Sequence, residues 1–221
     1  MSTTTEENYL KTLLALSADT EGKVSVSNLA KALAISTPSA NSMVKKLAER
    51  GLVSYQKYKP LQLTKPGRKA AALVVRKHRL TEMFLVEQMG FGWEEVHAIA
   101  EQIEHVDSPA FFARMDELMG HPKVDPHGSP IPDENGNITS KNRRRLSECG
   151  AGETVCVVGL DHNSNEFLHF LNDRDLSLGT TLNIHHREAF DGSLTLSYPG
   201  HNQVTFSKVV AERLLVGELS S

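Results

Sequence analysis

The first 72 residues carry three helical patterns followed by two short alternating runs, and this order constrains the fold more than any other feature of the chain. Apolar residues recur at helical spacing within three stretches, 9–16, 29–34 and 40–47. Residues 52–55 and 61–64 then alternate like β-strands on either side of a polar, lysine-containing tip. Three helices followed by such a hairpin are typical of a winged helix-turn-helix.

Local signals predict where these helices begin and end. We expect Ser27 to cap the second helix, because a serine side chain can accept a hydrogen bond from the free N–H groups of the first turn. Thr37 is expected to cap the third helix, with Pro38 at its first position and Gly51 just after its end. A further helix is expected to begin at Pro66.

After residue 72, helical patterns give way first to a proline- and glycine-rich stretch and then to short β-runs. Helical patterns are predicted over 76–89, 93–106 and 109–119, with glycine or proline at the breaks between them. Residues 121–152 are rich in proline and glycine and predict an irregular connector. From about residue 153, short β-runs predict a small barrel, whose Asp/His-rich stretch 161–169 is expected to be a loop. The expected strands are Val155–Val158, Thr181–Ile184, Leu194–Tyr198 and Val204–Phe206.

Charge is unevenly distributed along the chain, whose net charge is −3. Residues 1–72 contain 11 Lys/Arg and 5 Asp/Glu, whereas the remainder contains 13 and 22 and all ten histidines. A basic head suits a polyanion, and an acidic, histidine-containing body suits cations. No apolar run approaches the ~20 residues needed to cross a bilayer, and the start lacks a signal sequence, so we expect a cytoplasmic protein without membrane contact.

The third helix is the predicted DNA-reading element, because a helix-turn-helix places this helix in the major groove. The residues at its N-terminal end include no arginine to bind guanine, so we expect binding through phosphate contacts and van der Waals fit. The alternative is a solvated polar face on a purely structural three-helix unit. The residues expected near base edges are Ser36, Thr37, Pro38, Ser39, Asn41 and Ser42, and those near phosphates are Lys45, Lys46, Arg50, Lys57 and Lys59.

Histidine and glutamate recur on one face of the predicted helix 93–106, at positions i, i+4, i+7 and i+8, within an arc of ~100°. Two more, one turn apart, lie on the preceding helix. Imidazole and carboxylate groups both bind divalent transition ions. The alternative is that this face is simply the solvated side of the helix. The candidate ligands are His97, Glu101, Glu104 and His105 on one helix, and His78 and Glu82 on the other.

Four motifs, taken together, resemble the diphtheria toxin repressor family of iron- and manganese-dependent regulators. They are Arg76-Lys77-His78-Arg79-Leu80-Thr81-Glu82, Val96-His97, Ile103-Glu104-His105-Val106 and Pro126-His127-Gly128-Ser129-Pro130-Ile131-Pro132. The resemblance covers essentially the whole chain. It implies a metal-dependent transcriptional repressor that binds double-stranded operator DNA as a homodimer and controls metal-homeostasis genes.

The resemblance also implies two metal positions in each subunit. The ancillary position would use His78, Glu82 and His97, completed from the C-terminal barrel by Glu166 and by Asn163, where a carboxylate is usual. The primary position would use Glu101, Glu104 and His105, with Asn8 as a donor from the first helix.

Two departures from the iron-type pattern bear on the metal. Iron-type members have a cysteine where Glu101 stands and a methionine where Asn8 stands, whereas manganese-type members have glutamate at the first position and usually aspartate at the second. Hard oxygen donors in place of sulfur favour Mn²⁺ over softer ions. We therefore expect Mn²⁺, with Fe²⁺ as the alternative.

The combined prediction is a mainly α-helical protein with a small all-β domain. Its expected parts are a winged helix-turn-helix (1–72), a helical metal-binding and dimerisation domain (73–125), a connector (126–150) and an SH3-like barrel of the ferrous-transport A type (151–221). Two other functions stay open: a winged-helix regulator that senses an organic small molecule, and a metalloenzyme, although no His-Glu-x-x-His motif is present. The barrel could in addition bind another protein.

Overall fold

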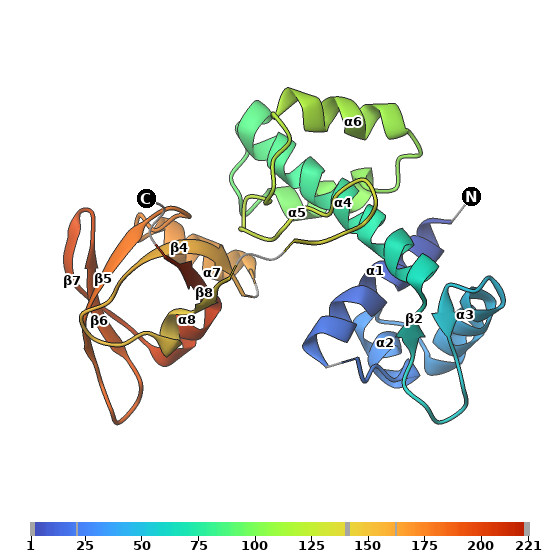
Figure 1. Ribbon diagram of the computed structural model, residues 1–221, viewed down its shortest axis with the longest axis horizontal. Helices are drawn as coiled ribbons and strands as arrows, with labels where there is room; N and C mark the ends of the chain where they lie inside the picture. Colours follow the sequence, from blue (N-terminus) through green and yellow to red (C-terminus); the bar gives the residue numbers. More distant parts are fainter. Residues whose placement is uncertain (1–2, 21, 140–141, 162, 219–221) are drawn as a thin grey trace. The chain divides into compact units, whose positions relative to one another are not determined.

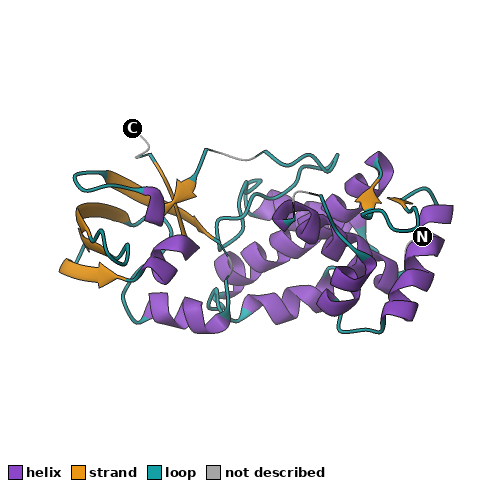
Figure 2. Ribbon diagram, turned by 90° about the horizontal axis from the view of Figure 1, so that it is seen from below, coloured by secondary structure: helices purple, strands orange, loops and turns teal. Residues whose placement is uncertain are grey.

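The computed structural model describes residues 3–20, 22–139, 142–161 and 163–218 (Figure 1). The chain divides into two compact units whose segments alternate along the sequence. The first unit comprises residues 1–81, 98–123 and 131–139, and the second comprises 82–97, 124–130 and 140–221. Apart from one short hairpin, the strands belong to the second unit (Figure 2).

The first unit begins with the predicted winged helix-turn-helix. Its helices are α1 (Thr4–Asp19), α2 (Val26–Ala32) and α3 (Thr37–Glu49), and its hairpin is formed by β1 (Val53–Ser54) and β2 (Gln62–Leu63). The strands are antiparallel, with Val53 opposite Leu63. One apolar core joins these elements, because every element contributes a buried side chain to it; examples are Leu10, Leu29, Val44 and Leu63. The predicted order of elements is confirmed.

Two predicted helix caps are wrong by one or two residues. Ser25, not Ser27, caps α2, because Ser25 has extended backbone angles and its side chain accepts a hydrogen bond from the N–H of Asn28. Likewise Ser36 caps α3, so that Thr37 and Pro38 form its first turn. A cap must lie just outside the helical backbone, whereas Ser27 already lies inside α2.

The remaining helices are α4 (Lys65–Met89), α5 (Val96–Ile103) and α6 (Pro109–Leu118). Helix α4 is continuous for 25 residues, where the sequence patterns predicted two stretches that meet near residue 76. Helix α5 is shorter than the predicted 93–106, so Glu104 and His105 follow its last residue. Of the helices within the described ranges, none has both the length and the apolar character needed to cross a membrane.

The second unit contains a six-stranded antiparallel sheet with the strand order β3-β8-β4-β5-β6-β7. Its elements are β3 (Arg144–Arg145), β4 (Thr154–Leu160), α7 (Asn165–Asn172), β5 (Thr181–Arg187), β6 (Leu194–Tyr198), β7 (His201–Phe206), α8 (Lys208–Arg213) and β8 (Leu214–Gly217). The four expected strands are present. The expected loop 161–169 is wrong in part, because Ser164 caps α7 and the buried Phe167 and Leu171 pack this helix into the core of the sheet.

A tight turn at 124–130 lies against strand β4 within the second unit. One carboxylate oxygen of Asp125 accepts hydrogen bonds from the backbone N–H groups of His127 and Ser129. The backbone N–H of Leu160 donates to the carbonyl of His127. Gly128 has a φ of +84°, and a Cβ atom at this residue would lie 2.3 Å from the carbonyl oxygen of Val158. The backbone of the turn therefore approaches β4 as closely as only glycine allows.

This close approach predicts that Gly128→Ala destabilises the protein by about 3 kcal/mol or more, since the side chain adds a clash with backbone atoms to the cost of a positive φ. Gly152→Ala is the matched control, because Gly152 has a φ of +86° but a Cβ atom there would meet nothing within 4 Å. That variant should lose only about 1 kcal/mol. Urea unfolding of the two variants measures the difference, and equal losses would contradict a close approach at Gly128.

Candidate metal centre

The first group of candidate ligands surrounds a buried carboxylate in the first unit. We call it the Glu104 cluster; its members are Lys11, His78, Glu101, Glu104 and His105. The side chain of Glu104 is 0% exposed. Its Oε2 lies 2.6 Å from Nδ1 of His78, and its Oε1 accepts a hydrogen bond of 2.6 Å from Nζ of Lys11. The cluster thus joins α1 and α4 to the segment that follows α5.

Lys11 contacts two carboxylates at once. Besides its bond to Glu104, its Nζ donates to Oε1 of Glu101 over 2.7 Å. Burial acts to raise the pKa of Glu104, but hydrogen bonds with His78 and Lys11, together with the charges of these groups, bring the pKa below its usual value. Glu104 is therefore a carboxylate anion inside the protein.

Helix α1 adds further polar groups to this cluster. Glu7 Oε2 lies 2.7 Å from Nδ1 of His105, and Nε2 of His105 lies 3.5 Å from Oε1 of Glu104. One residue after Glu7, the side-chain oxygen of Asn8 is buried, and in the described part of the chain it has no hydrogen-bond partner. A buried carbonyl oxygen without a donor is costly, and it is a suitable ligand for a hard cation.

The second group lies in the second unit, and we call it the Glu82 cluster: Glu82, Asp125 and His127. Each is buried, and their ligand atoms lie within 4.8 Å of one another. Glu82 comes from α4, and the other two come from the turn at 124–130. His97, which is exposed, lies with Nδ1 3.2 Å from Oε1 of Glu82.

The hydrogen bonds of His127 indicate which of its ring nitrogens can bind a cation. Nε2 lies 2.9 Å from the backbone carbonyl of Trp93, so this nitrogen carries the proton and donates it. Nδ1 is then an acceptor, and it lies 3.9 Å from the carboxylate of Glu82. The Glu82 carboxylate and Nδ1 of His127 are thus two buried acceptors that suit a cation between them. In many metal-bound histidines, the nitrogen that does not bind the metal donates to a carbonyl, as Nε2 of His127 does here.

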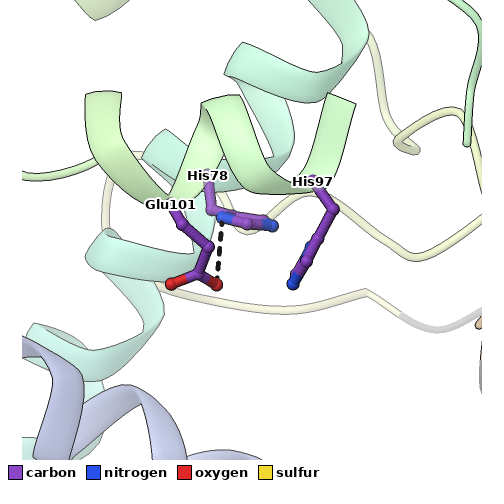
Figure 3. A group of neighbouring side chains, drawn as sticks. All are labelled: His78, His97 and Glu101. Carbon is purple, nitrogen blue, oxygen red and sulfur yellow. Dashed lines mark ion pairs between the residues drawn. The ribbon is translucent and has the colours of Figure 1, made fainter. Parts of the chain in front are cut away.

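A third arrangement involves His78 of α4 and Glu101 of α5. Figure 3 shows the imidazole of His78 beside the carboxylate of Glu101, with Nδ1 3.9 Å from Oε1. His97 lies one turn before Glu101 on α5.

Two predicted ligands are exposed, and two candidate ligands were not predicted. Asn163 and Glu166 are exposed at the start of α7, and neither belongs to the two metal-ligand groups found among the described residues. A hydrogen bond with its own backbone N–H and one with Ser164 lower the pKa of Glu166. Asp125 and His127 were not predicted, although the Pro-His-Gly motif at 126–128 marks their turn.

The predicted DNA-reading side chains are mostly exposed. Among the residues predicted to contact DNA, those that are solvent-exposed at the N-cap and along α3 are Ser36, Thr37, Pro38, Ser39, Ser42, Lys45 and Lys46. Asn41 is half-buried, because its side-chain oxygen accepts a hydrogen bond from the hydroxyl of Tyr55. Lys57 and Lys59 are exposed in the wing loop on either side of Tyr58, which is 92% exposed.

Comparisons with known proteins agree with a DNA-binding head joined to a metal-binding body. Residues 1–61 match the N-terminal DNA-binding domain of iron-dependent repressors, residues 64–133 match their metal-binding and dimerisation domain, and residues 144–217 match the FeoA domain. The iron-dependent repressor IdeR of Mycobacterium tuberculosis is 32% identical over 96% of both chains. The diphtheria toxin repressor of Corynebacterium diphtheriae is 30% identical over 89% of both.

A solved manganese-dependent transcriptional repressor in complex with manganese is also similar. It has a TM-score of 0.85 and 33% identity over 97% of this chain and 100% of that one. A winged head combined with carboxylate–imidazole clusters defines the class of metal-dependent transcriptional repressors. Within this class, the chain belongs to the diphtheria toxin repressor family. The family consists of repressors and not of enzymes, so neither alternative function is retained.

The burial of Glu104 predicts a large effect of its charge on stability. Glu104→Gln should lower the free energy of unfolding in chelator by about 3 kcal/mol, because Lys11 and His78 lose the anion that they contact inside the protein. Glu101→Gln is the control, because Glu101 contacts the same lysine but is 39% exposed; it should cost under about 1 kcal/mol. Urea denaturation measures both, and a larger loss for Glu101→Gln would contradict this ranking.

Proposed function

We propose that this repressor responds to Mn²⁺, with Fe²⁺ as the alternative metal, and binds a pseudo-palindromic operator as a cytoplasmic homodimer. The observation that carries the proposal is the buried Glu82 cluster, with its ligand atoms within 4.8 Å of one another. Its donors are oxygen and imidazole nitrogen, which suit Mn²⁺ better than softer ions. The similar repressor solved with manganese supports the same choice.

The first proposed metal position is the Glu82 cluster itself. Two carboxylates and one imidazole offer oxygen and nitrogen donors to a divalent cation. His97 is a fourth candidate donor, because it already lies beside Glu82. Binding there would hold the turn at 124–130 against the second half of α4.

The second proposed position lies around Glu101 and brings the proposed count to two ions per subunit. His78 and Glu101 provide one donor pair, with Nδ1 3.9 Å from Oε1. We propose Glu104, His105 and the unpartnered oxygen of Asn8 as the further donors, as the family resemblance implies. Glu166 and Asn163 remain predicted donors from the C-terminal domain.

Helix α1 provides the link from this position to DNA binding. Leu10 and Leu13 belong to the core of the winged head, whereas Glu7 and Lys11 contact the Glu104 cluster. A change that tightens the cluster therefore restrains the helix on which the head is built. A bound ion would supply positive charge to the Glu104 cluster. The population of protein molecules would then shift toward one arrangement of the winged head.

Dimerisation is proposed to use the helical segment that matches the metal-binding and dimerisation domain. Phe111 and Leu118 of α6 are exposed apolar side chains in this segment and suit burial against a second copy. Two heads related by a two-fold axis would then read half-sites about one helical turn apart.

The scheme predicts that DNA binding depends on metal. Duplexes selected from a random pool with Mn²⁺ present should bind at least about tenfold more weakly in chelator, measured by mobility shift. Glu82→Gln and His127→Ala should lose most of this difference. His121→Ala is the matched control, because His121 also pairs with a carboxylate, that of Asp116, but lies outside both clusters. Equal affinity with Mn²⁺, Fe²⁺ and chelator would contradict the proposed function.

A second prediction concerns the lysines of α3. Replacing Lys45 and Lys46 with alanine should weaken binding to all duplexes and reduce the slope of log affinity against log salt by about 0.9 for each phosphate group that is no longer neutralised. Lys208→Ala is the control, because Lys208 is an exposed lysine of α8 that pairs with Glu212. An unchanged salt slope in the double variant would mean that other residues bind the phosphates.

A further inference from the structure

The Glu104 cluster contains a cation that belongs to the protein itself. We propose that Lys11 occupies the Glu101–Glu104 carboxylate pair in the metal-free protein and competes with a divalent ion for it. Lys11 would then set the metal concentration at which the second proposed position fills. The inference rests on the proposed function, because it concerns one of the two metal positions proposed above.

The geometry is that of an occupied cation site. Nζ of Lys11 lies 2.7 Å from Oε1 of Glu101 and 2.6 Å from Oε1 of Glu104. The lysine side chain is only 19% exposed, and that of Glu104 is completely buried. An exposed ion pair contributes little, but a buried carboxylate needs a partner charge, and the ammonium group supplies it.

The ammonium group and a metal ion compete for this carboxylate pair. A divalent transition ion binds a carboxylate oxygen at about 2.0–2.2 Å, and one oxygen of each carboxylate, Oε1, already accepts a hydrogen bond from Nζ. Two cations at such short separation also repel each other. Metal binding to this pair therefore requires the flexible lysine side chain to leave.

The two proposed metal positions are consequently unequal. The Glu82 cluster presents two carboxylates and an acceptor nitrogen that face one another. At the Glu101–Glu104 pair, an entering ion must first displace Lys11, which reduces its net binding free energy. We expect a first ion to bind tightly and a second ion to bind more weakly.

The displaced lysine also has a structural role, because it belongs to α1. Through Lys11, α1 is joined to Glu101 and Glu104 before any metal arrives. If a metal ion replaced the ammonium group, this ion pair would break, and Glu7, which contacts His105, and Asn8 would be the groups of the same helix that remain at the cluster. Binding of the second ion would therefore replace the Lys11 ion pair by contacts through Glu7 and Asn8 as the link between the head and the cluster.

Calorimetric titration of chelator-treated protein with Mn²⁺ tests the proposal. Wild type should show a tight and a weak binding event, and Lys11→Met should tighten the weak event by about tenfold or more, leaving the tight one unchanged. Lys77→Met is the matched control. Lys77 donates to the backbone carbonyl of Glu104 and lies over the ring of Phe112, so its replacement should leave both events as in wild type.

Thermal unfolding gives a readout that does not depend on DNA. In chelator, Lys11→Met should melt below wild type, because Glu104 loses its partner charge; Mn²⁺ should then raise its melting temperature more than it raises that of wild type. Lys11→Gln, which keeps a neutral hydrogen-bond donor, replaces the methionine variant if the latter does not fold. Lys11→Arg keeps the charge and should bind the second ion no better than wild type.

Two outcomes separate failure of the inference from failure of the proposed function. If Lys11→Met and Lys11→Gln bind the second ion no more tightly than wild type, Lys11 forms only a structural ion pair and the inference is overturned. If wild type and all the lysine variants bind no Mn²⁺ at all, the proposed function itself fails.

Discussion

The structure depends on one buried anion, the carboxylate of Glu104, and on the groups gathered around it. A charge in that place is tolerated only because Lys11 and His78 lie within hydrogen-bond distance of its two oxygens. These partners come from α1 and α4, so the need to compensate one charge brings together segments that are far apart in sequence. The same need places several metal-binding groups side by side.

The same helix, α1, contributes residues to the DNA-binding head and to the candidate metal centre. Successive turns of α1 carry apolar residues into the head core on one face and polar residues toward Glu104 on another. A helix with two such faces transmits a change at one of them to the other, because its backbone is stiff. The two faces of one helix thus give the proposed metal response a physical basis.

Much of the fold and part of the candidate metal centre could be predicted from sequence. The features that could not be predicted were missed for the same physical reason. Periodicity predicted α1, α3 and the hairpin, and the spacing of His97 and Glu101 placed them on one face of α5. The Glu82 cluster was predicted only in part, because Asp125 and His127 come from a turn whose path is determined by contacts with β4 rather than by local pattern. Lys11 was missed for a similar reason: its partners are about 90 residues away in sequence.

The turn at 124–130 has one more implication. Its conformation depends on Gly128 against β4 and on Arg143, whose side chain donates to the carbonyl of Gly128. Both supports, β4 and Arg143, lie beyond residue 140, in a part of the chain that carries no predicted DNA-reading residue. A chain shortened before residue 140 would retain Glu82, Asp125 and His127 but lack the surface that shapes their turn. The C-terminal domain thus acts as the scaffold for a ligand set encoded outside it.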